Sequence, residues 1–219
     1  MTERIGGQKG SLITFEGVDF SGKTTQAQLL KERLKREGHQ VVLVREPGGT
    51  KISEGIRRIL LDRENERMED FTELLLYVAS RAQLTQEIIV PALREGKIVL
   101  CDRYADSSLA YQGYGRGLDL DLVKRLNHLA TEGLTPHLTF VFDINIEEAE
   151  GRRPNRNRAG DRLEEAGRVF FNRVRFGYRK IGEEERSRVV VLDGSRGIEE
   201  LQEEVWKWLK PLVKESTSQ

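Results

Sequence analysis

Short apolar segments alternate along the chain with longer amphipathic ones. The short segments are mostly aliphatic or β-branched and end at turn-forming residues, as buried strands do; they are Leu12–Phe15, Gln40–Val44, Ile98–Cys101, Leu138–Phe142 and Val189–Leu192. Apolar residues at helical spacing predict helices near Lys23–Glu37, Lys51–Leu61, Phe71–Arg94, Asp119–Thr131, Glu147–Arg153, Arg162–Glu184 and Ile198–Leu209. This alternation predicts an α/β fold of three layers, in which a five-stranded parallel sheet is flanked by helices.

Length and charge narrow the possible partners. The 219 residues suit one domain over residues 1–219, and we expect residues 1–10 and 214–219 to be flexible ends. Lys plus Arg (36) equals Asp plus Glu (36), so no overall field favours nucleic acid or a membrane surface. No apolar run approaches the roughly 18 residues of a membrane span. The single cysteine, Cys101, excludes an internal disulfide and favours a cytoplasmic location.

The first predicted strand runs directly into a glycine-rich loop that fits the pattern G-x-x-x-x-G-K-[ST] and precedes a predicted helix. An ordinary turn with a surface lysine rarely has this context. The two glycines let backbone N–H groups surround a phosphate, to which the helix N-terminus adds its dipole. We expect Lys23 on the β and γ phosphates of ATP and the Thr24 hydroxyl on Mg²⁺. The predicted ATP-binding residues are Gly17, Val18, Asp19, Phe20, Ser21, Gly22, Lys23, Thr24 and Thr25. They indicate the P-loop NTPase fold.

An acidic and a basic residue follow the third predicted strand. Asp102 stands at the carboxyl end of this strand, where ligands of open α/β sheets bind, and its carboxylate suits Mg²⁺. Arg103 fits a second phosphate near the metal. An ordinary ion pair at a strand end is the alternative interpretation. With the P-loop, the pair indicates two phosphorylated substrates.

Residues 151–162 hold five arginines and one acidic residue, and Pro154 and Gly160 mark this segment as a loop. By composition alone, a solvated basic loop or a nucleic-acid contact would be the simpler interpretation. Beside a P-loop, the segment is better interpreted as a short arginine-rich lid that brings guanidinium groups to the transferring phosphoryl group and excludes water.

Several motifs together resemble the thymidylate kinase family over nearly the whole chain. They are GVDFSGKTT, REPGGT (45–50), LLLYVASR (74–81), DRYADSSLAYQGYGRG (102–117) and DRLE (161–164). The P-loop is shared by many NTPases, whereas REPGGT with DRY and SSLAYQG is specific to this family. The resemblance implies transfer of phosphate from ATP to dTMP with Mg²⁺, and a homodimer. Phe20 stands where some relatives have an arginine, so the chain resembles the bacterial type with catalytic lid arginines.

The resemblance also implies residue roles. Asp19 is expected on the sugar 3′-hydroxyl, Tyr77 against thymine, and Arg81 on thymine O4, where its donors would disfavour cytosine. Tyr111 is expected against the deoxyribose and Ser108 and Gln112 near the base edge.

The same resemblance assigns the phosphate contacts. Arg103 matches the arginine on the acceptor phosphate, and Arg45 and Glu46 lie beside that phosphate in relatives. Arg153 and Arg158 are the lid arginines expected to be catalytic together with Lys23 and Arg103. The loop Asp193–Gly197 matches the adenine-side segment.

Three other functions fit part of the pattern. Another nucleoside or nucleotide kinase would share the loop and the lid. A regulatory GTPase is disfavoured because no guanine-reading N-K-x-D motif is present. A nucleic-acid-binding ATPase would use the basic segment 151–162, but the zero net charge disfavours it.

Overall fold

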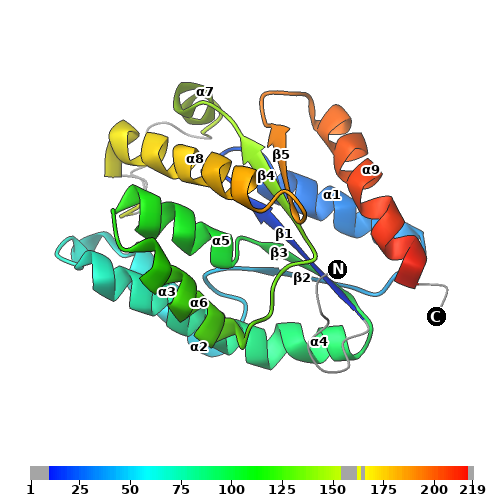
Figure 1. The fold of residues 1–219 in the computed structure, drawn as a ribbon, viewed down its shortest axis with the longest axis horizontal. Helices are drawn as coiled ribbons and strands as arrows, with labels where there is room; N and C mark the ends of the chain where they lie inside the picture. Colours follow the sequence, from blue (N-terminus) through cyan, green and yellow to red (C-terminus); the bar gives the residue numbers. More distant parts are fainter. Residues whose placement is uncertain (1–9, 154–161, 164–165, 217–219) are drawn as a thin grey trace.

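The strands lie in one parallel sheet in the computed structural model, which describes residues 10–153, 162–163 and 166–216. Its strands β1 (Ser11–Glu16), β2 (Val41–Arg45), β3 (Ile98–Asp102), β4 (Leu138–Asp143) and β5 (Val189–Asp193) are arranged in the order β2-β3-β1-β4-β5 (Figure 1). This confirms the predicted five-stranded sheet, with strand ends shifted by about one residue. β1 is central, between β3 and β4.

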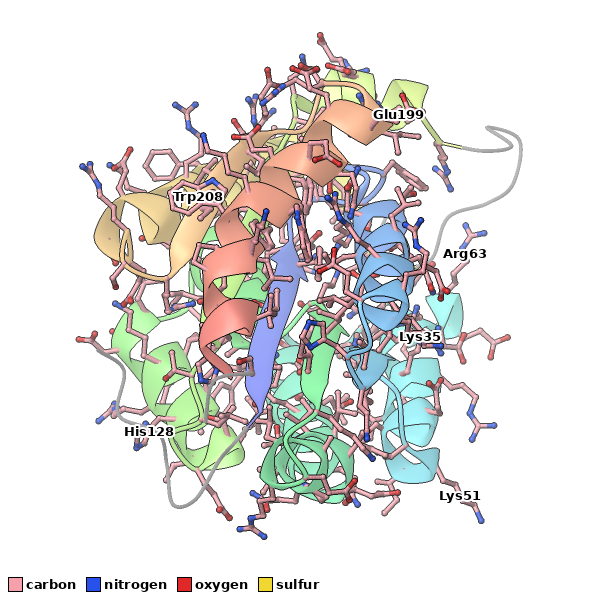
Figure 2. The ribbon with its side chains drawn as sticks, turned by 90° about the vertical axis from the view of Figure 1, so that its right-hand side faces the viewer. Lys35, Lys51, Arg63, His128, Glu199 and Trp208 are labelled. Carbon is pink, nitrogen blue, oxygen red and sulfur yellow. The ribbon has the colours of Figure 1, made fainter. Side chains whose placement is uncertain are left out.

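Helices cover both faces of the sheet. On one face lie α1 (Lys23–Arg36) and α9 (Ile198–Ser216), which Figure 2 shows in front of β1, with Lys35 on α1 and Trp208 on α9. The other face carries α3 (Asp70–Leu84), α4 (Val90–Arg94), α5 (Ala105–Ser108), α6 (Leu120–Thr131) and α8 (Gly167–Glu184) (Figure 1). α2 (Lys51–Leu61) packs on α3, and α7 (Ile146–Gly151) follows β4. Among these helices, none has the length and apolar character needed to cross a bilayer.

Successive side chains of β1 point to opposite faces of the sheet, as pleating requires. Ile13 and Phe15 pack with the helices α1 and α9, whereas Leu12 packs on the other face with Val99 and Cys101 of β3. Burial of each large apolar side chain contributes about 1.5–3 kcal/mol. The same alternation directs the last residue of β1, Glu16, toward the face that α5 and α8 cover.

Some predicted elements differ from the structure. The helix predicted over Phe71–Arg94 is α3, a π-helical segment η2 (Thr85–Ile89) and α4 in succession, and a 3₁₀ turn η1 (Arg63–Asn65) precedes it. Helix α8 begins at Gly167 and α9 extends to Ser216, so the predicted start at Arg162 and the predicted end at Leu209 were wrong. α7 ends at Gly151, before the predicted Arg153.

The helical segment after β3 was not predicted. It consists of α5 and the π-helix η3 (Leu109–Gly115). The reason is that several of its buried positions are polar, including Ser107, Ser108 and Gln112, so the segment lacks the apolar periodicity of a helix.

Gly177 of α8 provides a test of the packing between α8 and η3. A Cβ atom there would lie 2.7–2.8 Å from three side-chain atoms of Tyr114. Alanine is the better helix former by about 1 kcal/mol. We nevertheless expect Gly177→Ala to lower the free energy of unfolding by about 1–3 kcal/mol because of overpacking, as measured by urea denaturation.

The control is a double-mutant cycle with Tyr114→Gly, which removes all three of these atoms, Cβ included. If the overpacking argument holds, the cost of Gly177→Ala disappears when residue 114 is already glycine. Equal costs in both backgrounds would contradict it.

Candidate active site

The loop between β1 and α1 has the conformation of a phosphate cradle. Gly17 has a φ of 137°, and a Cβ atom there would lie 2.7 Å from the Phe142 carbonyl oxygen. Gly22 has a φ of 96° and caps α1. Lys23 is buried, with Nζ 3.3 Å from the Val18 carbonyl oxygen. Burial and the Arg103 charge lower the pKa of Lys23. A buried ammonium with few acceptors suits an anionic ligand.

A cavity of about 700 Å³ opens beside this loop, and we call it the donor cavity. It is lined by Asp19, Phe20, Ser21, Gly22, Lys23, Thr24, Thr25, Gln26, Arg152, Ser195, Arg196, Gly197, Ile198 and Leu201. The predicted ATP-binding residues from Asp19 to Thr25 therefore lie on one wall, and Gly17 and Val18 do not line it. Arg152 donates from Nη1 to the Gly194 carbonyl oxygen (2.8 Å), which joins α7 to the loop after β5. Gln26, Ile198 and Leu201 were not singled out in the sequence.

Asp102 and Thr24, the predicted metal ligands, meet at the edge of the sheet. Thr24 Oγ1 donates to Asp102 Oδ2 (2.5 Å), while Asp102 Oδ1 is buried without a hydrogen-bond partner. In the described part of the chain, no three His, Cys, Asp or Glu residues form a metal cluster. One carboxylate and one hydroxyl suit a hard cation whose other ligands are phosphate oxygens and water.

Arg103 lies on the opposite side of the loop and has its guanidinium surrounded by acceptors. Nη1 donates to the Gly17 carbonyl oxygen (2.8 Å) and Nη2 to Asp19 Oδ1 (2.7 Å) and the Tyr111 hydroxyl (3.1 Å). Although burial would raise the pKa of Asp19, Arg103 and Lys23 hold it at about 2. The φ of Arg103 is 71°, a conformation that non-glycine residues rarely adopt. Strain of this kind is common at functional sites.

A second cavity adjoins Arg103, and we call it the acceptor cavity. It is lined by Asp19, Glu46, Pro47, Arg57, Leu61, Tyr77, Arg103, Ser107, Tyr111, Gln112 and Leu163. Its volume is about 90 Å³, below the roughly 300 Å³ of common ligand pockets, so a nucleotide can enter only if lining side chains move. The residues of this lining that sequence reasoning missed are Pro47, Arg57, Leu61, Ser107 and Leu163. Arg57 and Leu61 belong to none of the quoted motifs, whereas Pro47 belongs to REPGGT, Ser107 to DRYADSSLAYQGYGRG and Leu163 to DRLE.

The predicted acceptor-binding residues are thus only partly assembled at this cavity. Asp19, Glu46, Tyr77, Arg103, Tyr111 and Gln112 line it. Arg45 does not, because its side chain is 53% exposed and pairs with Glu54 (2.8 Å). Ser108 and Arg81 lie behind the wall, where Arg81 Nη2 donates to Ser108 Oγ (2.9 Å).

Arg81 belongs to a buried ion pair with Glu46. Its guanidinium is completely buried and donates to both carboxylate oxygens of Glu46, to Asn127 and to the Tyr104 carbonyl oxygen. Burial raises the pKa of Glu46, and the Arg81 charge opposes that rise. Arg81 is therefore the structural partner of a carboxylate in the cavity wall.

A second buried carboxylate, Glu73 of α3, was missed by sequence reasoning. It accepts from Gln112 Nε2 (2.9 Å), from Arg116 Nη2 (3.0 Å) and from Arg162 Nη2 (2.5 Å). Arg162 also donates from Nε to the Leu60 carbonyl oxygen (2.9 Å). Glu73 thus joins the acceptor cavity to the DRLE motif. A single glutamate on an amphipathic helix gives no signal for such a role.

Of the predicted catalytic lid arginines, Arg153 lines a third cavity, of about 470 Å³, together with Val18, Phe20 and Phe171. Arg158 and most of the predicted lid segment lie outside the described residues.

The fold and the site define a class of protein. A P-loop at the carboxyl edge of a parallel sheet, a carboxylate and a hydroxyl suited to a cation, and a second cavity with an arginine are the parts of a P-loop phosphotransferase. A thymidylate kinase family model matches residues 15–205. The chain belongs to the thymidylate kinase family.

Comparisons with individual proteins support the same family. A thymidylate kinase from Geotalea uraniireducens is 49% identical over 87% of this chain and 92% of its own length. One from Kosmotoga olearia is 47% identical over 89% of this chain and 93% of its own length. A crystal structure of thymidylate kinase from Ehrlichia chaffeensis superposes with a TM-score of 0.75 at 37% identity, covering 92% of this chain and 98% of that one.

Arg81→Ala should lower the free energy of unfolding by about 3–5 kcal/mol, because it leaves the Glu46 carboxylate buried without its partner. Arg45→Ala is the matched control. It breaks an arginine–glutamate pair that is exposed, so we expect a loss of less than about 1 kcal/mol. Guanidinium chloride denaturation measures both, and similar losses would refute the assignment.

Proposed function

We propose that this protein transfers the γ-phosphoryl group of MgATP to the 5′-phosphate of dTMP, which yields dTDP for the supply of dTTP. Membership of the thymidylate kinase family supports the reaction and the acceptor. The observation that carries the proposal is the position of Asp19, which lines both the donor and the acceptor cavity and pairs with Lys23 (3.6 Å) and Arg103 (2.7 Å). Two nucleotides in these cavities would direct their phosphates toward each other.

Catalysis would come from positioning and from charge neutralisation, without a covalent intermediate. Lys23 would hold the β and γ phosphates together with backbone N–H groups of the P-loop. Arg103 would hold the acceptor phosphate on the other side. That phosphate is already ionised near neutral pH, so no general base is needed. Arg153 and Arg158 would bring further positive charge to the phosphoryl group in flight.

Thr24 and Asp102 would hold Mg²⁺ at the donor phosphates. The ion supplies neutralisation of the charge that develops on the transferring group. The buried, unpartnered Oδ1 atom of Asp102 supports this assignment.

On the acceptor side, Tyr77 would stack on thymine and Gln112 would contact its edge. Tyr111 would lie against the deoxyribose, and Asp19 would accept from the 3′-hydroxyl. Arg81 and Ser108 could reach the base only if the wall of the acceptor cavity opened, because Arg81 is fully buried. Arg45 would need to leave Glu54 to approach the phosphate.

A nucleotide panel tests the reaction. With ATP, dTMP should be the preferred acceptor over dUMP, dCMP, dAMP and thymidine, measured by coupled ADP release. Lys23→Ala should lower kcat/KM for dTMP by several orders of magnitude, because the variant lacks the positive charge that would stabilise the transferring phosphate. Thermal denaturation of Lys23→Ala controls for folding. Full activity of this variant, or a stronger preference for another acceptor, would overturn the proposal.

We also propose a homodimer in the cytoplasm. Exposed apolar side chains on the packed helices α2 and α3, namely Ile52, Ile59, Phe71 and Leu75, support a second copy as the partner. Ile52 and Ile59 are seven residues apart and so lie on one side of α2. The single cysteine is compatible with a reducing compartment.

Sedimentation tests the dimer. The protein should sediment with twice the mass of one chain, and Ile52→Glu/Ile59→Glu should shift it toward the single chain because charges in an apolar interface lose their hydration. Trp208→Glu is the control, since this exposed apolar residue lies on α9, on the other side of the sheet. A single-chain mass for the unaltered protein would refute the proposal.

A further inference from the structure

Glu16 is a fully buried carboxylate that the proposed mechanism does not use. It is the last residue of β1 and immediately precedes the P-loop. Its Oε1 atom accepts from the Tyr104 backbone N–H (2.7 Å). Its Oε2 atom accepts from Ser107 Oγ (2.6 Å) and from the Tyr178 hydroxyl (2.8 Å). The two hydroxyl oxygens also lie 3.0 Å from each other, but the charged Glu16 oxygen is the nearer and stronger acceptor for both, so both hydroxyl protons point toward Glu16.

The direction of these protons determines what the two hydroxyl groups offer to Arg103. Each hydroxyl has one proton, and once it is donated to Glu16 only lone pairs remain on the oxygen. Arg103 Nη1 lies 3.2 Å from the Tyr178 hydroxyl and 3.4 Å from Ser107 Oγ, in positions to donate to both. The Glu16 charge thus makes two acceptors available on one side of the Arg103 guanidinium.

We propose that Glu16 is a positioning residue that orients the Arg103 guanidinium toward the acceptor phosphate by aligning the hydroxyl groups of Ser107 and Tyr178. The role rests on the proposed function, since Arg103 meets the acceptor phosphate only if a nucleoside monophosphate binds there. Glu16 itself does not touch a substrate. Its effect is on the free energy of binding of the acceptor phosphate.

The electrostatic environment of Glu16 indicates that ionisation of this carboxyl group does not stabilise the fold. Burial and the neighbouring Asp106 raise the pKa of Glu16 to about 7, although Arg103 opposes the rise. A carboxyl group whose pKa is higher in the folded chain than in the unfolded chain destabilises the fold when it ionises. The other charged or titratable groups that interact with it are Lys23 of α1, Arg81 of α3, Cys101 of β3 and Tyr178 of α8.

Glu16→Gln tests the role because it keeps the shape of the side chain and replaces one acceptor oxygen by an NH₂ group, which only donates. The glutamine oxygen can still accept from the Tyr104 N–H, so the amide nitrogen faces the two hydroxyl groups. These must then accept from the amide. One hydroxyl can donate to the other, so at least one proton turns toward the donors of Arg103. We expect the dissociation constant for dTMP to rise about tenfold, as measured by calorimetry at about pH 8, where Glu16 is mostly ionised.

Thymidine is the matched ligand because it lacks the phosphate. Its dissociation constant, and the KM for ATP, should change less than about twofold, since neither depends on the acceptor phosphate. Equal weakening of dTMP and thymidine would indicate general damage to the site and would overturn the proposal. So would unchanged binding of dTMP. Binding of dTMP by the unaltered protein tests the proposed function separately. If the unaltered protein did not bind dTMP, the proposed function itself would have failed.

Variants of the two hydroxyl residues test the same role if Glu16→Gln folds poorly. Tyr178→Phe and Ser107→Ala each remove one aligned hydroxyl, so each alone should weaken dTMP more than thymidine. In the Ser107→Ala/Tyr178→Phe background, Glu16→Gln should have almost no further effect on dTMP, because no hydroxyl is left to misalign. Additive effects would show that Glu16 acts by another route, and the proposal would be rejected.

Discussion

A guanidinium group withdrawn from water must be surrounded by acceptors, and that requirement organises the centre of this molecule. Arg103 satisfies it with groups from the P-loop, from the helical segment after β3 and from α8: Gly17, Asp19, Ser107, Tyr111 and Tyr178. An unpaired buried charge would cost several kcal/mol. The hydrogen bonds to Arg103 therefore fix these three elements relative to one another around the place where the two substrates are proposed to meet.

The end of β3 separates the chemistry into two sides. In β3, Ile98 and Leu100 pack toward α1 and α9, and Asp102 continues this row and meets Thr24 of α1. Arg103 is adjacent in sequence but lies on the other side, beside the acceptor cavity. The strand ends at Asp102, and Arg103, with a φ of 71°, begins the turn that leads to α5. A single dipeptide would in this way serve the proposed metal on the donor side and the proposed phosphate on the acceptor side.

Much of the fold and of the donor side could be predicted because their signals are local. Apolar runs and helical periodicity identify the strands and the covering helices, and the spacing of Gly17, Gly22 and Lys23 identifies a loop whose geometry depends mainly on its own backbone. The acceptor side was less predictable. Its walls depend on carboxylates such as Glu46 and Glu73, whose partners are 35 and 39 residues away in the sequence.

The sequence by itself determined the parallel α/β architecture, the phosphate-binding loop and the family, since each is written in contiguous residues or in a regular period. Only the tertiary structure decided that residues 105–115 are helical, that Arg81 pairs with Glu46 behind the cavity wall, and that Glu16 and Tyr178 adjoin Arg103. The physical reason is desolvation. Once a polar group is buried, its partner is whichever group the packing brings within hydrogen-bond distance, and packing joins segments that are far apart along the chain.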